Sequence, residues 1–159
     1  MIVTQPKPFE AITKKLDSVA ARDVLIVGCG GCATTSGTGG ATEVAALAEK
    51  LGESGYTVVG TVVPDNACNV GIVKAALRGL DVDPDATVVL SCGSGVQVVA
   101  DVEEDVPTLS GLNTMFLGNS LRVGSYEQRC MMCGSCSLSE TGGICIKTLC
   151  PKGIANGPC

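Results

Sequence analysis

Apolar and polar residues recur along the chain with more than one period. Within residues 8–20, apolar side chains return every three or four positions, which predicts a short amphipathic helix after an extended lead-in at residues 1–7. The apolar positions are Phe9, Ile12, Leu16 and Val19. We expect this apolar side to pack on the following domain, with docking to a partner protein as the alternative.

From residue 23 onward, short apolar runs alternate with helical patterns. Strands are predicted at residues 23–27, 57–63 and 86–91, helices at 41–51, 70–80 and 96–101, and a further strand at 114–117. Gly52 and Gly55 are expected to end the first of these helices. Strand and helix alternation with short connections is typical of right-handed βαβ units. We therefore predict a Rossmann-like α/β fold, with a parallel sheet covered by helices on both faces.

Size and composition agree with one such domain followed by a small appendage. A chain of 159 residues has room for one ordinary domain and a short metal-stapled segment. With two Phe, two Tyr and no Trp, the core must consist of small branched side chains, which suit a buried parallel sheet. We divide the chain into an N-terminal helix and lead-in at 1–22, a Rossmann-like domain at 23–125 and a cysteine-rich domain at 126–159.

The charge pattern excludes several classes of partner. The net charge is −5 and there is no long Lys/Arg run, so neither nucleic acid nor an anionic membrane is expected as a partner. We find no signal-peptide pattern and no run of eighteen apolar residues, and we expect a cytoplasmic protein. In a reducing compartment, ten cysteines, several of them at C-x2-C spacing, indicate metal binding rather than disulfides. Because the chain has no His, an all-thiolate site would hold either iron–sulfur or zinc.

The densest group of cysteines lies in the last thirty residues. Cys130, Cys133 and Cys136 have the spacing C-x2-C-x2-C, which lets one loop supply three ligands to a [4Fe-4S] cluster. The fourth ligand often comes from further along the chain and is often followed by proline. Cys150, which precedes Pro151, is therefore the favoured fourth ligand.

Two questions about this group stay open. Cys145 and Cys159 are the alternatives for the fourth position. Zinc is the alternative to iron–sulfur, because a four-thiolate zinc site would stabilise a segment that is too small to fold by burying apolar side chains alone. The C-x2-C-x2-C spacing favours the cluster, since zinc ligands usually come as two separated pairs.

A second group of cysteines emerges only when the predicted fold is considered. Cys29 and Cys32 follow the first predicted strand of the sheet, Cys68 follows the second, and Cys92 follows the third. In a parallel sheet these loops meet at the carboxyl edge, where open α/β folds place their sites. The helices that begin there would stabilise thiolates with their N-terminal amides. We predict a second metal centre here; the alternative is that these cysteines are buried as small apolar residues.

The first of these loops also has a rival interpretation. Residues 28–33, Gly-Cys-Gly-Gly-Cys-Ala, satisfy the G-x-G-x-x-[G/A] pattern of dinucleotide-binding loops. No acidic residue stands at the end of the second strand, where such proteins bind the ribose, and Asp65 lies too far along the chain. Two thiols would also occupy the turn that receives the pyrophosphate.

No group of residues indicates a substrate-converting site. Without His, the Ser-His and Cys-His nucleophile pairs are impossible. Isolated carboxylates such as Glu43 and Glu103 are interpreted as solvated, and Lys147 and Lys152 as charges that balance a nearby cluster. We predict no catalytic residues.

The C-terminal motifs resemble those of a known family. The run C-x2-C-G-x-C from Cys130, followed by TGGIC, CPKG and NGPC, is similar to the cysteine-rich domain of the iron–sulfur/zinc small subunit of methylenetetrahydrofolate reductase from acetogens and related anaerobes. This resemblance implies a non-catalytic subunit that relays electrons through two [4Fe-4S] clusters to the flavin of a catalytic partner subunit. It leaves the upstream donor open among a ferredoxin, an NADH-oxidising flavoprotein and a heterodisulfide-reductase-like subunit. The alternative function is a zinc-binding module that stabilises or docks the flavoprotein without carrying electrons.

Overall fold

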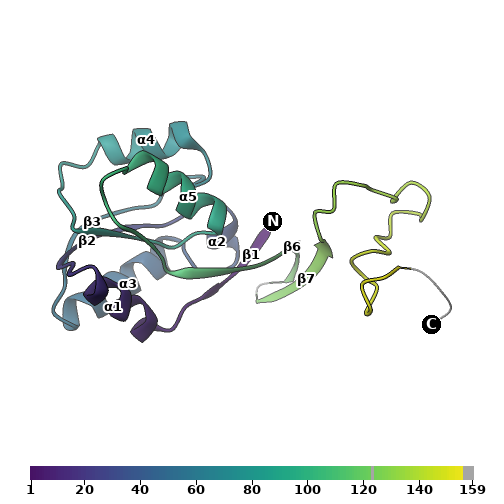
Figure 1. Ribbon diagram of the computed structural model, residues 1–159, viewed down its shortest axis with the longest axis horizontal. Coiled ribbons are helices and arrows are strands. Elements are labelled where there is room, and N and C mark those ends of the chain that lie inside the picture. The colour runs from purple at the N-terminus through teal and green to yellow at the C-terminus, as the bar shows by residue number, and fades with distance from the viewer. Residues whose placement is uncertain (123, 156–159) are drawn as a thin grey trace.

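A four-stranded parallel sheet forms the centre of the molecule. The computed structural model describes residues 1–122 and 124–155 and gives this sheet the order β3-β2-β4-β5 (Figure 1). Its strands are β2 (Asp23–Val27), β3 (Thr57–Val62), β4 (Ala86–Val89) and β5 (Thr108–Ser110). The predicted Rossmann-like arrangement is confirmed, and the first three of these strands lie within two residues of their predicted ends.

Helices cover both faces of this sheet, as predicted. The helices are α1 (Phe9–Ser18) and α3 (Ala41–Glu53) on one face, and α4 (Val70–Arg78) and α5 (Gly93–Val102) on the other. Val24 and Ile26 of β2 pack in the core beneath α1 and α3, whereas Leu25 and Val27 pack beneath α4 and α5. This alternation follows from the two-residue period of a strand. Among the described residues, no helix is long and apolar enough to span a membrane.

A three-stranded antiparallel sheet adjoins the carboxyl edge of the parallel one. It has the order β1-β6-β7, with β1 at Ile2–Pro6, β6 at Leu112–Arg122 and β7 at Ser125–Cys130. The expected lead-in is therefore a strand, β1, whose partner lies more than a hundred residues away (Ile2 pairs with Leu117). The strand expected at 114–117 exists within β6, but it pairs antiparallel with β1 and β7, and the fourth parallel strand is the three-residue β5.

The helix ends differ from the sequence prediction in ways that matter for the cysteines. Helix α3 continues through Gly52 to Glu53, and Gly55, with a φ of 86°, makes the left-handed turn after it. Helix α5 begins at Gly93, directly after Cys92. A short helix that the sequence pattern did not predict, α2 (Cys32–Thr35), begins at Cys32. The cysteine loops thus end at the first residues of helices.

Candidate metal centres

The four cysteines at the carboxyl edge line one small cavity. Cys29, Cys32, Cys68 and Cys92 border a space of about 30 Å³, together with small side chains from the loops after β3 and β4. These loops follow three neighbouring parallel strands, so their ends converge as the topology requires. The structure therefore brings together all of the thiols that were predicted to meet here.

Cys29 and Cys32 are fixed by the glycine loop that follows β2. Cys29 is buried, with 7% of its surface exposed, and its backbone N–H donates to Gly39 O at 2.8 Å. Its carbonyl accepts hydrogen bonds from both the backbone N–H and the hydroxyl of Thr34, at 3.2 and 2.7 Å. Cys32 is partly exposed at the start of α2. These hydrogen bonds fix the backbone of the loop at Cys29.

Cys68 and Cys92 stand at the N-termini of the two helices on the opposite face. Cys68 is exposed and precedes Asn69, whose side-chain oxygen caps α4 by accepting from the Ile72 N–H at 3.1 Å. Cys92 is partly exposed and is itself the N-cap residue of α5. Both cysteines therefore lie next to the N-terminal turn of a helix.

The donor set suits a thiolate-bound metal, but the side chains as they lie do not form a coordination sphere. Within residues 1–122 and 124–155, no three Cys, Asp or Glu side chains are gathered closely enough to hold a metal ion. A space of about 30 Å³ has room for about two water molecules. Holding a cluster here therefore requires the thiol side chains to move from the positions that they have in this structure. All nine described cysteines are free, so none is committed to a disulfide.

The glycine loop at residues 28–33, after β2, is poorly suited to a dinucleotide. Its first three amides, which would have to face a pyrophosphate, donate instead to backbone carbonyl oxygens of the protein. The pairs are Gly28 with Val62 at 2.7 Å, Cys29 with Gly39 at 2.8 Å and Gly30 with Pro64 at 2.8 Å. A phosphate would therefore have to displace three backbone hydrogen bonds, and the geometry disfavours the dinucleotide interpretation.

The second group of cysteines surrounds a larger cavity beyond β7. Cys130, Cys133, Cys136 and Cys145 line a space of about 370 Å³. Cys130 is the last residue of β7, and the segment that follows it runs without helix or strand to residue 155, beyond β7 and away from the parallel sheet (Figure 1). The favoured fourth residue, Cys150, does not line this cavity, whereas the alternative, Cys145, does.

Local hydrogen bonds lower the pKa of several thiols in this segment. For Cys133 the main cause is backbone hydrogen bonding at Ser135, and the positive charge of Lys147 lowers the pKa further. For Cys145 the cause is Thr148, whose hydroxyl lies 3.3 Å from Cys145 Sγ. A lower thiol pKa favours the thiolate, which is the form that binds metal.

The two remaining cysteines are placed differently. Cys150 Sγ accepts the backbone N–H of Ala155 at 3.2 Å, and this bond lowers the pKa of the Cys150 thiol. The thiolate form of Cys150 is therefore also favoured relative to an ordinary thiol, although Cys150 lies outside the four-thiol cavity. Cys159 lies outside the described residues, so its role stays a prediction.

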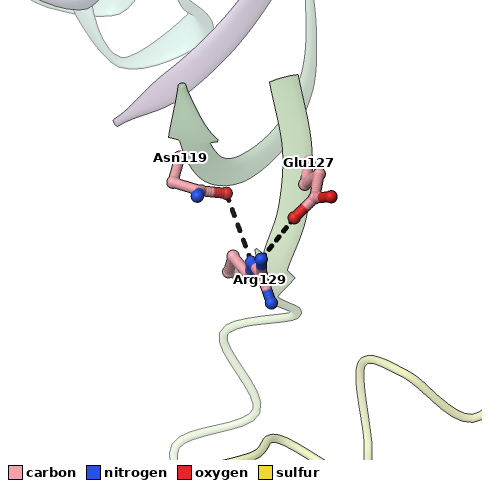
Figure 2. A network of polar contacts seen from close by, with 3 residues as sticks. All are labelled: Asn119, Glu127 and Arg129. Atoms are coloured by element: carbon pink, nitrogen blue, oxygen red, sulfur yellow. Dashed lines mark hydrogen bonds and ion pairs between the residues drawn. The ribbon is translucent and has the colours of Figure 1, made fainter. Parts of the chain in front are cut away.

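An arginine that the sequence analysis did not identify borders the same cavity. Arg129 of β7 pairs with Glu127 on the same strand, and its Nε donates to Asn119 Oδ1 of β6 at 3.3 Å (Figure 2). Arg129 also lines the cavity of Cys130. No local sequence pattern marks this residue, because its partner Asn119 becomes a neighbour only when β6 and β7 pair.

Strand β6 connects the two groups of cysteines. Near its start, Thr114 Oγ1 accepts the N–H of Gly93, the residue after Cys92, at 2.8 Å. Three residues later, Leu117 pairs with Cys130 of β7. Three residues of a strand span about 10 Å. The two contact points on β6 therefore lie about 10 Å apart.

The fold and these sites define an α/β protein with two cavities, each lined by four cysteines. Residues 109–159 match the model of the family described as "Methylene-tetrahydrofolate reductase C terminal". This third of the chain contains β6, β7 and the C-terminal cysteines, and it is similar to the C-terminal region that this family describes. Searches of curated proteins and of solved structures gave no match.

Proposed function

We propose that the chain is an electron-transfer subunit of a methylenetetrahydrofolate reductase complex. In this proposal two [4Fe-4S] clusters pass electrons to the flavin of a catalytic partner subunit. The observation that carries it is the pair of cavities, each lined by four free thiols, in a chain that contains no His. The family match of the C-terminal third supports the choice of complex.

The chain's own cysteines would hold the clusters. A [4Fe-4S] cluster, when bound to four cysteines, supplies one-electron transfer without proton or group transfer. The proposed ligands are Cys29, Cys32, Cys68 and Cys92 for one cluster and Cys130, Cys133, Cys136 and Cys145 for the other. Strand β6 supports the relay because it contacts both sites. The donor stays open among a ferredoxin, an NADH-oxidising subunit and a heterodisulfide-reductase-like subunit, and we propose a cytoplasmic location.

Metal content tests the proposal directly. Two [4Fe-4S] clusters predict about eight iron atoms per chain, with broad visible absorption that dithionite bleaches. Cys29→Ser and Cys133→Ser are each expected to lose about half of the iron, because each removes a ligand from a different site. The measurement is anaerobic iron and sulfide analysis of the full chain. A parent protein that is colourless when prepared without oxygen would contradict the proposal.

The fourth ligand of the C-terminal cluster can be tested in the same assay. Since Cys145 lines the cavity and Cys150 does not, we expect Cys145→Ser to lose as much iron as Cys133→Ser. Cys150→Ser is the matched control, because it removes a thiol of the same segment, and we expect it to keep nearly all of the iron. The reverse pattern would select Cys150, the ligand that sequence spacing favours.

A zinc-binding structural module is the second candidate function, and the irregular C-terminal segment suits it as well as it suits a cluster. The segment from 131 to 155 has neither helix nor strand, and its large apolar side chains are exposed, among them Met132 at 68%, Ile144 at 56% and Ile154 at 59%. A segment without a core of its own depends on a bound metal for its structure, which either zinc or a cluster provides. Zinc without iron in the parent protein would select this function, in which the chain stabilises or docks the flavoprotein.

A further inference from the structure

Lys147 connects two separate parts of the C-terminal segment through its side chain. Its Nζ donates to the carbonyl of Ser135 at 2.6 Å and lies 3.7 Å from Cys133 Sγ. Ser135 and Cys133 belong to the loop that carries the cysteine triplet, whereas Lys147 follows Cys145 by two residues. The side chain therefore spans the two pieces of chain that border the four-thiol cavity.

Other contacts do not duplicate this connection. Among the described residues of 131–155, the remaining hydrogen bonds within the segment join residues at most five positions apart, such as Gly143 N–H with Leu138 O at 2.8 Å. Those of Lys147 span twelve and fourteen positions. With no helix, strand or apolar core in this segment, Lys147 provides its long-range polar link.

The charge of Lys147 is also available to the cavity. Arg129 borders the same cavity, but its guanidinium is paired with Glu127. Within residues 1–122 and 124–155, Lys147 forms no ion pair with a carboxylate, and its Nζ lies 3.7 Å from Cys133 Sγ. Four thiolates around a metal carry excess negative charge, and an adjacent cation offsets part of it.

We propose that Lys147 is a positioning residue for the C-terminal metal centre. It holds the triplet loop against the Cys145 segment and places one positive charge beside Cys133. The inference rests on the proposed function for the identity of the metal centre, but its geometry applies equally to zinc. For an iron–sulfur cluster, reduction adds one electron and therefore one negative charge, which the neighbouring cation stabilises. Lys147 therefore raises the reduction potential of this cluster.

The experiment compares three variants of the full-length chain, loaded anaerobically with iron and sulfide. Lys147→Met removes both the charge and the hydrogen bonds, and Lys147→Arg keeps the charge. Lys152→Met is the matched control, because Lys152 is exposed in the same segment and does not line the cavity. The readout is a dithionite titration followed by electron paramagnetic resonance. The C-terminal transition is identified as the one that Cys133→Ser abolishes.

We expect the C-terminal transition to move to a lower potential in Lys147→Met, to move less in Lys147→Arg, and to stay in place in Lys152→Met. The other transition is expected to stay unchanged in all three. A Lys147→Met protein with full iron content and an unshifted potential would overturn the inference while leaving the proposed function intact.

A second arm separates this inference from the identity of the metal. Cobalt(II) titration of the metal-free chain reports thiolate coordination through its charge-transfer absorption, whichever metal is native. Loss of a residue that bonds to a ligand typically weakens metal binding 10- to 100-fold. We expect about tenfold weaker cobalt binding in Lys147→Met and parental binding in Lys152→Met. Equal cobalt affinities in the two variants would count against the positioning role, whereas absence of iron from the parent would count only against electron transfer.

Discussion

At the scale of single residues, Glu103 shows how the fold changes the properties of a carboxylate. It lies at the end of α5, half-buried and close to Thr87 of β4, and neither Glu103 Oε2 nor the fully buried Thr87 Oγ1 makes a hydrogen bond within the described part of the chain. Burial raises the pKa of Glu103, and a weak interaction with Thr87 offsets only part of this effect. The interpretation of Glu103 as solvated was therefore wrong, because α5 packs it against the sheet.

This raised pKa predicts a pH-dependent stability penalty. The folded state holds the proton of Glu103 more tightly than the unfolded state, so stability falls as pH rises above 4.5, the ordinary pKa of a glutamate side chain. Glu103→Gln removes the titration, and we expect its melting temperature to exceed that of the parent at neutral pH by about 1 to 3 °C. The advantage should shrink toward pH 4, where the parent carboxyl is protonated.

Thermal unfolding of both proteins between pH 4 and pH 8 measures this difference. Glu104→Gln is the control, since Glu104 is exposed and its substitution should leave the curve unchanged. Glu103, Lys74 and Arg78 line one surface cavity. A Glu103→Gln protein that is less stable than the parent at pH 7, but equally stable at pH 4, would therefore contradict the prediction. It would show that the Glu103 carboxylate interacts favourably with Lys74 or Arg78.

At the scale of secondary-structure elements, the β6–β7 hairpin joins the body of the protein to the cysteine segment. Gly118 of β6 is in close contact with the neighbouring strand, since a Cβ placed on it would lie 2.0 Å from the carbonyl oxygen of Glu127. Gly118→Ala must therefore push β7 away from β6. We expect a loss of about 1 to 3 kcal/mol in the free energy of unfolding, measured by chemical denaturation.

Gly52 provides a matched control for this substitution. It lies inside α3, and a Cβ there would meet no atom within 4 Å. Gly52→Ala is expected to gain about 0.5 to 1 kcal/mol, because alanine loses less conformational freedom in a helix. If both substitutions changed stability by the same amount, the tight packing of β6 against β7 would be refuted.

Elements whose patterns are local could be predicted from the sequence, and elements defined by distant partners could not. The apolar runs of β2 and β4 are buried on both faces and therefore stand out in the sequence, and β3 is a partly buried edge strand with an apolar run of its own. Strand β5 has only three residues, and β1 carries polar Thr4 and Gln5 beside a partner in β6. The signal for such strands lies in tertiary pairing, which periodicity does not record.

At the scale of the whole molecule, topology was the better guide to the site at the carboxyl edge. The loops after successive parallel strands had to converge, so the meeting of Cys29, Cys32, Cys68 and Cys92 followed from the fold class. In the C-terminal segment no such rule applies, since residues 131–155 form neither helix nor strand. Spacing alone favoured Cys150, whereas the loop path places Cys145 beside the triplet.

The pairing of β1 with β6 bears on how the molecule is made on the ribosome. Ile2 cannot pair with Leu117 until Leu117 has been synthesised. At about 5 to 20 residues per second, translation of the intervening chain takes roughly 5 to 20 seconds. The strands β2, β3 and β4 have all emerged by then. We therefore expect the antiparallel sheet, and with it the anchor of the cysteine segment, to form only after the strands β2, β3 and β4 have been synthesised.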